Sequence, residues 1–400
     1  MKILQINTVY GYGSTGVILK DIHELCAVNN IESFVAYSLS NLPDNEIKNG
    51  YKIGGAFGKK LHAAFCRING MQGYFSRFST WRFIRYIDKI NPEIVQLHNL
   101  HSNYIHLNML LKYLAKKDIK TIVTLHDCWF YTGGCFHYTT AGCDKWLESC
   151  GECPKNKRGA KALLFDRSSK ILRDRKKYFG AIKNLTIVGV SKWITDEALK
   201  TVFKDKKAVA IHNGVDTDFF RPVDSDLRKR YGLENKFIIL GPYGKWTSRY
   251  NREIFNSVVN SLKDDEVLVL VGCRDKNIIS HEKVIVLPFV TDRNQLREIY
   301  SSADVFVNPT NEESLSLINV EAQSCGTPVI THLNTGVRET VDGICGFAVE
   351  NGNTQAIIKQ IALIKEKGKS YFTEDCRRWV KENFNRDENY NKYISLYYEV

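Results

Sequence analysis

Two glutamates near residue 320 are the side chains in this sequence whose types and spacing best suit binding chemistry. An apolar run that ends at Asn308 predicts a buried strand, and a helical pattern begins near Leu317 and ends at Gly326. Glu313 lies in the loop between these elements, and Glu321 lies about two helical turns beyond it. Carboxylates in such positions can accept hydrogen bonds from sugar and ribose hydroxyls. Taken alone, two glutamates with this spacing are more common on a solvated helix face.

The surrounding stretch resembles the E-x7-E signature of the retaining glycosyltransferases called family 4, and the match continues through Cys-Gly-Thr-Pro-Val-Ile. The resemblance implies that Glu313 contacts the donor sugar and that Glu321 binds the ribose of the nucleotide, with Leu317 among the donor-binding residues. One departure is local, because residues 314–317 read Ser-Leu-Ser-Leu where the family usually has Gly-Phe-Gly-Leu. The adjacent Glu312 competes with Glu313 for the first role.

Two further blocks, Ile211–Pro222 and Leu287–Val307, resemble the same family, although each can also be purely architectural. The resemblance covers essentially the whole chain. It implies an α/β protein of GT-B fold, in which two Rossmann-like, doubly wound domains face a cleft. It also implies transfer of a sugar from a UDP- or GDP-sugar with retention of configuration and without a catalytic metal. The implied acceptor is a glycan or a polyprenyl-diphosphate-linked oligosaccharide of a bacterial surface polysaccharide.

A basic segment follows the first strand of the second half. Related enzymes of polysaccharide assembly have Trp-Thr-x-Arg-Lys-Gly there, and Arg249 matches their arginine. Tyr250 replaces the lysine and Asn251 replaces the glycine. Because positive charge at this point stabilises the departing diphosphate, we expect Lys245 or Arg252 to supply what Tyr250 cannot.

In the first half, a glycine-rich loop follows the first predicted strand and precedes a helix. Gly13 and Gly16 could let this backbone approach a phosphate, although a plain strand-to-helix turn explains them equally well. His98, Asn99 and His126 end two later strands, and strand ends face the ligand crevice in such folds. The resemblance implies that His126 reaches the donor sugar; we place His98 and Asn99 on the acceptor side, and a structural role for either histidine stays open.

A cysteine-rich segment lies between these strands and the next. Cys135, Cys143, Cys150 and Cys153 end in a tight Cys-x-x-Cys pair, which is the ligand set of a closed structural zinc site. Free thiols and redox chemistry are the alternatives. The segment resembles a Cys-rich insertion found in exopolysaccharide transferases of the family.

Strand and helix patterns alternate along the chain and then restart, which predicts two parallel sheets with crossover helices. We expect an N-terminal, acceptor-side domain over residues 1–212, with the Cys-rich insertion near 128–154. A donor domain would follow over residues 213–385. By resemblance, a helix over residues 386–400 would cross back to the first domain.

The charge distribution suggests where the protein works. The formal net charge of +12 favours an anionic partner, and Lys59–Lys89 mixes cations with aromatic residues against one acid, Asp88. Such a face suits an anionic membrane surface, although an ordinary solvated face is the alternative. No apolar run reaches the roughly 20 residues of a spanning helix, and the first residues do not read as a signal peptide. We therefore expect a cytoplasmic protein, peripheral at the inner face of the cell membrane; the oligomeric state stays open.

Three other functions fit parts of the sequence. A nucleotide-sugar epimerase of GT-B fold would share the domains and the acidic loop. A non-catalytic glycosyltransferase-like subunit is suggested by Tyr250 and Asn251. A nucleic-acid-binding protein would fit the charge, but no recognised RNA or DNA module appears, so we expect no nucleic-acid partner.

Overall fold

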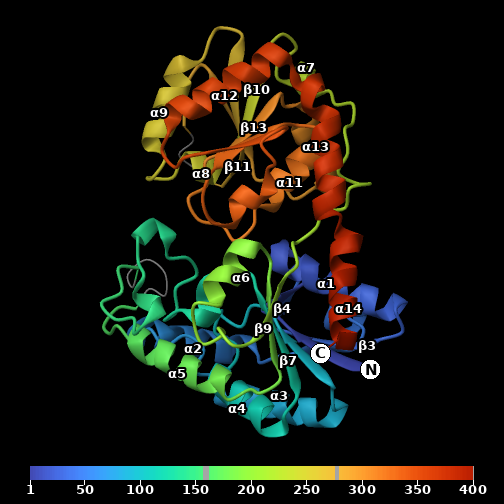
Figure 1. Ribbon diagram of the computed structural model, residues 1–400, viewed down its shortest axis with the longest axis vertical. Coiled ribbons are helices and arrows are strands. Elements are labelled where there is room, and N and C mark those ends of the chain that lie inside the picture. Colours follow the sequence, from blue (N-terminus) through green and yellow to red (C-terminus); the bar gives the residue numbers. More distant parts are fainter. Residues whose placement is uncertain (156–161, 275–278, 400) are drawn as a thin grey trace. The chain divides into compact units, whose positions relative to one another are not determined.

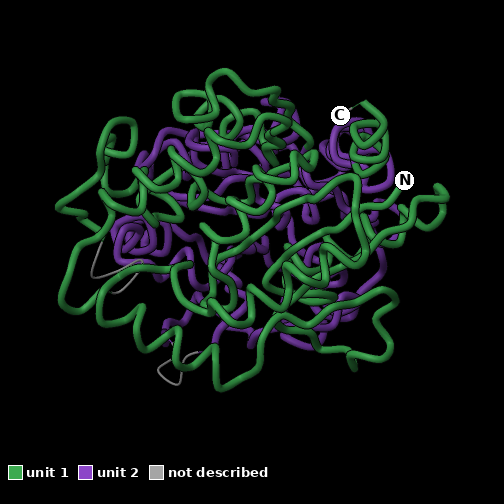
Figure 2. Tube along the Cα trace, turned by 90° about the horizontal axis from the view of Figure 1, so that it is seen from below, with its two compact units in different colours: residues 1–211, 390–400 green, residues 212–389 purple. Residues whose placement is uncertain are grey.

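The computed structural model describes residues 1–155, 162–274 and 279–399. Its chain divides into two compact units, which are drawn in different colours in Figure 2. Unit 1 comprises residues 1–211 and 390–400, and unit 2 comprises residues 212–389. Each unit is an α/β structure built on a parallel sheet, as the alternating strand and helix patterns predicted.

Unit 1 contains, among its described residues, a seven-stranded parallel sheet in the order β5-β3-β1-β6-β7-β8-β9. Figure 1 draws this unit from blue to green, with the last helix of the chain in red. Apart from the edge strands β5 and β9, the strands of this sheet are largely buried, which is why they read as continuous apolar runs rather than alternating ones. Their bounds are β1 Lys2–Ile6, β3 Glu32–Tyr37, β5 Gly50–Lys52, β6 Ile94–Leu97, β7 Lys120–Leu125, β8 Leu185–Gly189 and β9 Lys207–Ala210. Two short strands, β2 Val9–Tyr10 and β4 Leu39–Ser40, pair separately.

The longer helices of unit 1 connect these strands. They are α1 Gly13–Val28, α2 Ala56–Asn69, α3 Arg77–Ile90, α4 Leu107–Lys117, α5 Ser168–Gly180 and α6 Lys192–Ala198. Side-chain caps define two of their starts: the imidazole of His106 accepts from the Met109 amide, and Ser191 Oγ accepts from the Ile194 amide. The order of the strands reverses direction between β1 and β6, so this is the topological switch point of the sheet.

The last helix, α14 Arg386–Glu399, returns to unit 1. Tyr390, Tyr393 and Tyr397 pack in one buried cluster with Ile3 of β1, and the Tyr397 hydroxyl donates to Gln96 of β6. Burial of these aromatic rings against β1 stabilises the packing of the end of α14 in unit 1.

Unit 2 contains, within its described residues, a six-stranded parallel sheet in the order β12-β11-β10-β13-β14-β15. The strands are β10 Phe237–Pro242, β11 Glu266–Cys273, β12 Val284–Pro288, β13 Val305–Asn308, β14 Val329–His332 and β15 Gly346–Val349. The helices are α7 Leu227–Arg230, α8 Tyr243–Trp246, α9 Arg252–Ser261, α10 Arg293–Ser302, α11 Leu317–Ser324, α12 Thr354–Lys367 and α13 Lys369–Phe384. The order reverses between β10 and β13, which makes these two strands the switch point of unit 2.

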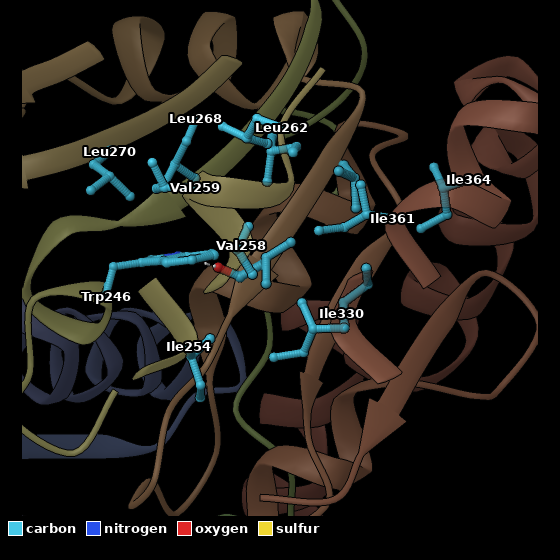
Figure 3. Packing of buried hydrophobic residues seen from close by; sticks show 14 of the residues in the cluster. Trp246, Ile254, Val258, Val259, Leu262, Leu268, Leu270, Ile330, Ile361 and Ile364 are labelled. Atoms are coloured by element: carbon cyan, nitrogen blue, oxygen red, sulfur yellow. Dashed lines mark hydrogen bonds between the residues drawn. The ribbon is translucent and has the colours of Figure 1, made fainter. Parts of the chain in front are cut away.

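Alternate residues of the same strands feed two separate cores, one on each face of this sheet. Ile239 packs in a cluster with Trp246 and residues of α9 and α12, part of which Figure 3 shows. Its neighbour Leu240 packs in the other cluster, with residues of α10, α11 and α13. This period-2 division means that helices cover both faces, which is the doubly wound arrangement.

Candidate functional site

The strand ends at the switch point of unit 2 carry a close ion pair. Lys245 of α8, directly after β10, places its Nζ 2.6 Å from Oε1 of Glu313, in the loop after β13. The second carboxylate oxygen of Glu313 is buried and has no hydrogen-bond partner among the described atoms. Arg252, the other basic candidate, opens α9 on the exposed surface. The structure therefore brings Lys245, rather than Arg252, to the acidic loop.

A network of buried side chains holds the two loops in place. The Trp246 indole donates to the Val307 carbonyl at 2.9 Å, which fixes α8 on β13. A Cβ on Gly241 would meet that indole at 2.0 Å, so the strand needs glycine at this point. The side-chain amide of Asn308 donates to Ser316 Oγ at 3.0 Å and to Asn319 Oδ1 at 2.8 Å, which ties the end of β13 to the start of α11. The loop that carries Glu313 is thus anchored at its first and last residues.

Asn251 links these same two loops. Its buried side-chain amide donates to the Lys245 carbonyl at 2.9 Å and also to the Pro309 carbonyl, while its Oδ1 accepts from Asn311 at 2.8 Å. The sequence marked Asn251 only as a departure from the family's glycine. The structure shows that it connects the loop of Lys245 to the loop of Glu313.

Arg249 lies on the exposed surface beside α8. Its guanidinium stacks over the Tyr250 ring at 4.4 Å from the ring centre, and it donates to the Tyr250 hydroxyl. The resemblance predicted lysine where Tyr250 stands; the Tyr250 ring and hydroxyl instead hold the guanidinium of Arg249.

Glu321 lies on α11 at a half-buried position. Its Oε2 accepts from the Tyr300 hydroxyl at 3.0 Å. Burial raises the pKa of Glu321 to about 7, against the opposing effects of the Tyr300 hydroxyl and of Arg293. Leu317 is the first residue of the same helix. A carboxylate held in this way can accept hydrogen bonds once a polar ligand replaces the missing solvent.

In unit 1, the loop after β1 is shaped by its glycines. Gly13 opens α1 with φ of +64°, and a Cβ there would meet no atom within 4 Å, so this backbone is open to a ligand. Gly16 has a different role, since a Cβ there would meet Val9 at 3.0 Å. It allows α1 to pack closely on β2.

Asn7 connects the two strands at the switch point of unit 1. Its side-chain amide donates to Val9 and Thr15 carbonyls, and its Oδ1 accepts from the Asn99 amide at 3.1 Å. Asn99 therefore contributes its backbone to the joint between β1 and β6. The sequence offered no signal for Asn7 beyond its position at the end of the first strand.

The two histidines that end β6 and β7 come together. Nδ1 of His98 lies 3.0 Å from Nε2 of His126, and the rings are stacked. Burial lowers the pKa of His126 to about 4, and burial with the neighbouring His126 holds the pKa of His98 well below its usual value. Both imidazoles are therefore neutral near pH 7 and able to donate or accept hydrogen bonds.

A second pair, His101 and Asp127, lies next to the first and was not singled out from the sequence. His101 Nε2 is 3.2 Å from Asp127 Oδ2, and Asp127 also accepts from the Trp129 amide at 2.8 Å. Burial acts to raise the pKa of Asp127, but the contacts with His101 and Trp129 outweigh it and hold that pKa below its ordinary value. Both residues lie in the loops that follow β6 and β7, and that position was the available signal.

The Cys-rich segment forms a pocket of its own. Cys135, Cys143, Cys150 and Cys153 all line one cavity of about 40 Å³, which Thr132, Gly133 and the start of α5 also border. Across the described residues, no three His, Cys, Asp or Glu side chains already stand in positions that would hold a metal ion. The zinc site thus stays a prediction.

Two family models match the chain. Residues 54–219 match Glycosyltransferase Family 4, and residues 234–366 match Glycosyl transferases group 1. The resemblance found in the sequence is confirmed.

Relatives and solved structures agree with these matches. The chain is 22% identical over 383 residues to the colanic acid biosynthesis glycosyl transferase WcaC of Escherichia coli, and 90% of each protein is covered. It is 25% identical over 225 residues to the Escherichia coli UDP-Gal:alpha-D-GlcNAc-diphosphoundecaprenol alpha-1,3-galactosyltransferase, covering 50% of this chain and 57% of that protein. HepE of Anabaena, solved in complex with UDP, matches with a TM-score of 0.69 at 13% identity over 100% of both chains. The expected GT-B fold is confirmed.

Proposed function

We propose that this chain, a glycosyltransferase of GT-B type, transfers a sugar from a UDP- or GDP-sugar with retention of configuration. The chain joins a Glycosyltransferase Family 4 domain to a Glycosyl transferases group 1 domain. The acceptor is a glycan or a lipid-linked oligosaccharide of bacterial surface polysaccharide synthesis. The observation that carries the proposal is the pairing of Lys245 with Glu313 at the switch point of unit 2.

In this proposal the donor binds at the carboxyl ends of β10 and β13. Glu321 accepts hydrogen bonds from the ribose hydroxyls, and its ionised form prevails once those donors replace lost solvent. Glu313 contacts the sugar. When the donor binds, the ammonium of Lys245 leaves the Glu313 carboxylate and pairs with the diphosphate. Arg249 adds a second positive charge. Their charges stabilise the leaving group as its bond to the sugar breaks.

His126 is assigned to the sugar that is transferred. As a neutral imidazole it donates or accepts one hydrogen bond to a hydroxyl, and the contact with His98 sets which nitrogen carries the proton. The open backbone at Gly13 and the strand end at Asn99 serve phosphate and acceptor.

The relatives support both substrate classes. HepE of Anabaena has been solved with UDP and with UDP-glucose, which favours a nucleotide-sugar donor. The name of the Escherichia coli galactosyltransferase specifies a diphosphoundecaprenol-linked acceptor, and WcaC is named for colanic acid biosynthesis. Both favour an acceptor that belongs to cell-surface polysaccharide assembly.

A membrane-bound acceptor would bring the protein to an anionic lipid surface. None of the described helices is long and apolar enough to cross a membrane. Instead, α2 exposes apolar side chains at helical spacing, namely Phe57, Leu61, Phe65 and Ile68. The Leu163 amide donates to the Arg67 carbonyl at 2.8 Å, so the exposed residues 163–165 lie beside this helix. The helix α3 adds exposed arginines, and the guanidinium of Arg85 stacks on the exposed Trp81 ring. Such a mixture suits reversible binding at the inner leaflet.

The test is a turnover assay with defined substrates. UDP- and GDP-sugars would first be screened by thermal shift, and the stabilising donor would then be incubated with an undecaprenyl-diphosphate-linked sugar. A product with the donor's anomeric configuration, read by NMR, is the expected result. An inverted product refutes retention, an isomerised donor without acceptor indicates an epimerase, and donor binding without any turnover indicates a non-catalytic subunit.

A further inference from the structure

The Cys-rich segment contains a small cavity bordered by sulfur, and the function proposed above makes no use of it. We propose that Cys135, Cys143, Cys150 and Cys153 bind one zinc ion in this cavity, and that the ion fixes the connection between β7 and α5. All four side chains line the same cavity although they span nineteen positions of the sequence, from 135 to 153. Each thiol releases its proton to solvent as its sulfur–zinc bond forms.

The cavity has room for an ion. One buried water needs roughly 10–15 Å³, and this cavity offers about 40 Å³. Its lining supplies four sulfurs, which is the donor set of a closed tetrahedral zinc site.

The backbone around the cavity is held in a form that suits ligation. A Cβ on Gly133 would meet the Cys150 sulfur at 2.9 Å, so glycine permits the approach of that thiol. The Gly151 amide donates to Ser168 Oγ at 3.1 Å, and the Cys153 amide donates to Asp166 at 2.7 Å, which anchors the Cys-x-x-Cys turn to the start of α5. The sulfurs border the cavity without yet meeting at one point. The Cys135 thiol donates to the His137 carbonyl at 2.8 Å, so ligation requires this bond to break and the side chain to turn toward the cavity.

Arg175 supplies an independent observation about charge. It is buried, and two of its guanidinium nitrogens lack a hydrogen-bond partner among the described atoms. Asp127 is the carboxylate that acts on this cation. Four thiolates and one Zn²⁺ carry a net charge of about −2, by summing their formal charges. A zinc–thiolate centre would therefore compensate this buried cation.

The same arginine connects the cavity to the strand end that carries His126. Arg175 stacks on Trp129 at 4.1 Å from the ring centre and donates to the Trp129 and Thr132 carbonyls. The Trp129 amide in turn donates to Asp127, the partner of His101. The ion thus positions the end of β7 through packing and takes no part in sugar transfer.

The experiment measures metal in the full-length protein after removal of any affinity tag and without chelators. Elemental analysis should give about one zinc per chain. In Co²⁺-substituted protein, the absorption bands should be those of a tetrahedral centre with four thiolates. Mercurial titration of the native wild-type protein should release the zinc in step with four thiols, a result that does not depend on whether any variant folds.

Two variants complete the test. The double variant Cys150→Ser/Cys153→Ser should lose at least nine-tenths of the zinc and lower Tm by about 5 °C or more. Cys273→Ser, which changes a buried cysteine in the sheet of unit 2, should keep its zinc. Wild-type protein without metal, with iron in its place, with a disulfide among the four cysteines, or with all four thiols freely titratable would overturn the proposal. Donor binding in unit 2 is measured separately, so failure here leaves the proposed function untouched.

Discussion

Lys245 and Glu313 come from different strand ends of unit 2, yet the lysine ammonium lies 2.6 Å from the glutamate carboxylate. The contact joins the basic segment after β10 to the acidic loop after β13, and it holds two charges that the proposed donor would separate. When an anionic diphosphate binds, Lys245 can leave the Glu313 carboxylate and pair with the diphosphate. The lysine therefore keeps an anionic partner.

Glu313→Gln should lower kcat by at least tenfold and change the donor Kd less than threefold. The amide keeps the shape of the side chain but loses the charge that would act as the sugar reacts, so the loss falls on the transition state. Steady-state kinetics and calorimetry on the same preparation separate the two effects. Glu312→Gln is the matched control, and equal losses in both variants would remove Glu313 from the site.

Glu321→Gln should stabilise the protein at pH 8 and weaken donor binding. The pKa of Glu321 is raised in the folded state from 4.5 to about 7. Below pH 4.5 both states are protonated, and between pH 4.5 and 7 the unfolded state ionises first, so the folded state loses stability as pH rises. The cost reaches up to about 3 kcal/mol above pH 7, at roughly 1.4 kcal/mol per pKa unit.

Melting curves at pH 4.5 and pH 8 check this prediction. The variant should match the wild type at the lower pH and exceed it at the higher one, while its affinity for the donor falls. A variant that is destabilised equally at both values would show that Glu321 is an ordinary ionised carboxylate.

Arg249→Ala should cost about 2 kcal/mol in kcat/KM, roughly a thirtyfold loss, because a charge-assisted contact to the diphosphate is removed. Tyr250→Phe is the milder partner variant: it removes the hydroxyl that Arg249 contacts and keeps the ring beneath the guanidinium. It should lower kcat/KM by less than Arg249→Ala does. If Arg249→Ala changes nothing, Lys245 carries the charge alone.

Asn251→Ala should destabilise the protein by about 1–3 kcal/mol, because the buried carbonyls of Lys245 and Pro309 lose their donor. Chemical denaturation measures the change. Asn256→Ala, at an exposed position of α9, is the control and should stay within about 0.5 kcal/mol of wild type. Equal stability of both variants would mean that Asn251 does not hold the two loops together.

Liposome binding tests the basic and aromatic face of unit 1. The wild-type protein should co-sediment with vesicles that contain phosphatidylglycerol and dissociate as salt rises, since each cation near the surface contributes about 1 kcal/mol and is screened by salt. Replacing Arg77, Arg82 and Arg85 with Glu should abolish the binding and leave donor hydrolysis intact; all three are exposed on α3.

The control for this charge reversal replaces Lys229, Lys359 and Lys381, which are exposed in unit 2, with Glu. It changes the net charge equally and should leave liposome binding unchanged. If both triple variants bind alike, or if the wild type ignores anionic vesicles at low salt, the face is solvated surface.

The sequence by itself determined the fold class and the loops where chemistry is concentrated. Both depend on local order: buried strands read as apolar runs, and Glu313, Lys245 and His126 lie within a few residues of the ends of those runs, where parallel strands present their carboxyl ends. Local patterns could also mark Asn251 as unusual, but they could not say what it contacts.

Only the tertiary structure decided which of these residues meet. The ion pair of Lys245 with Glu313 and the contact of His98 with His126 bridge strands that are adjacent in a sheet and distant in the chain. The raised pKa of Glu321 depends in the same way on what buries it. Strand order, close packing and desolvation are properties of elements far apart in sequence, so no local pattern encodes them.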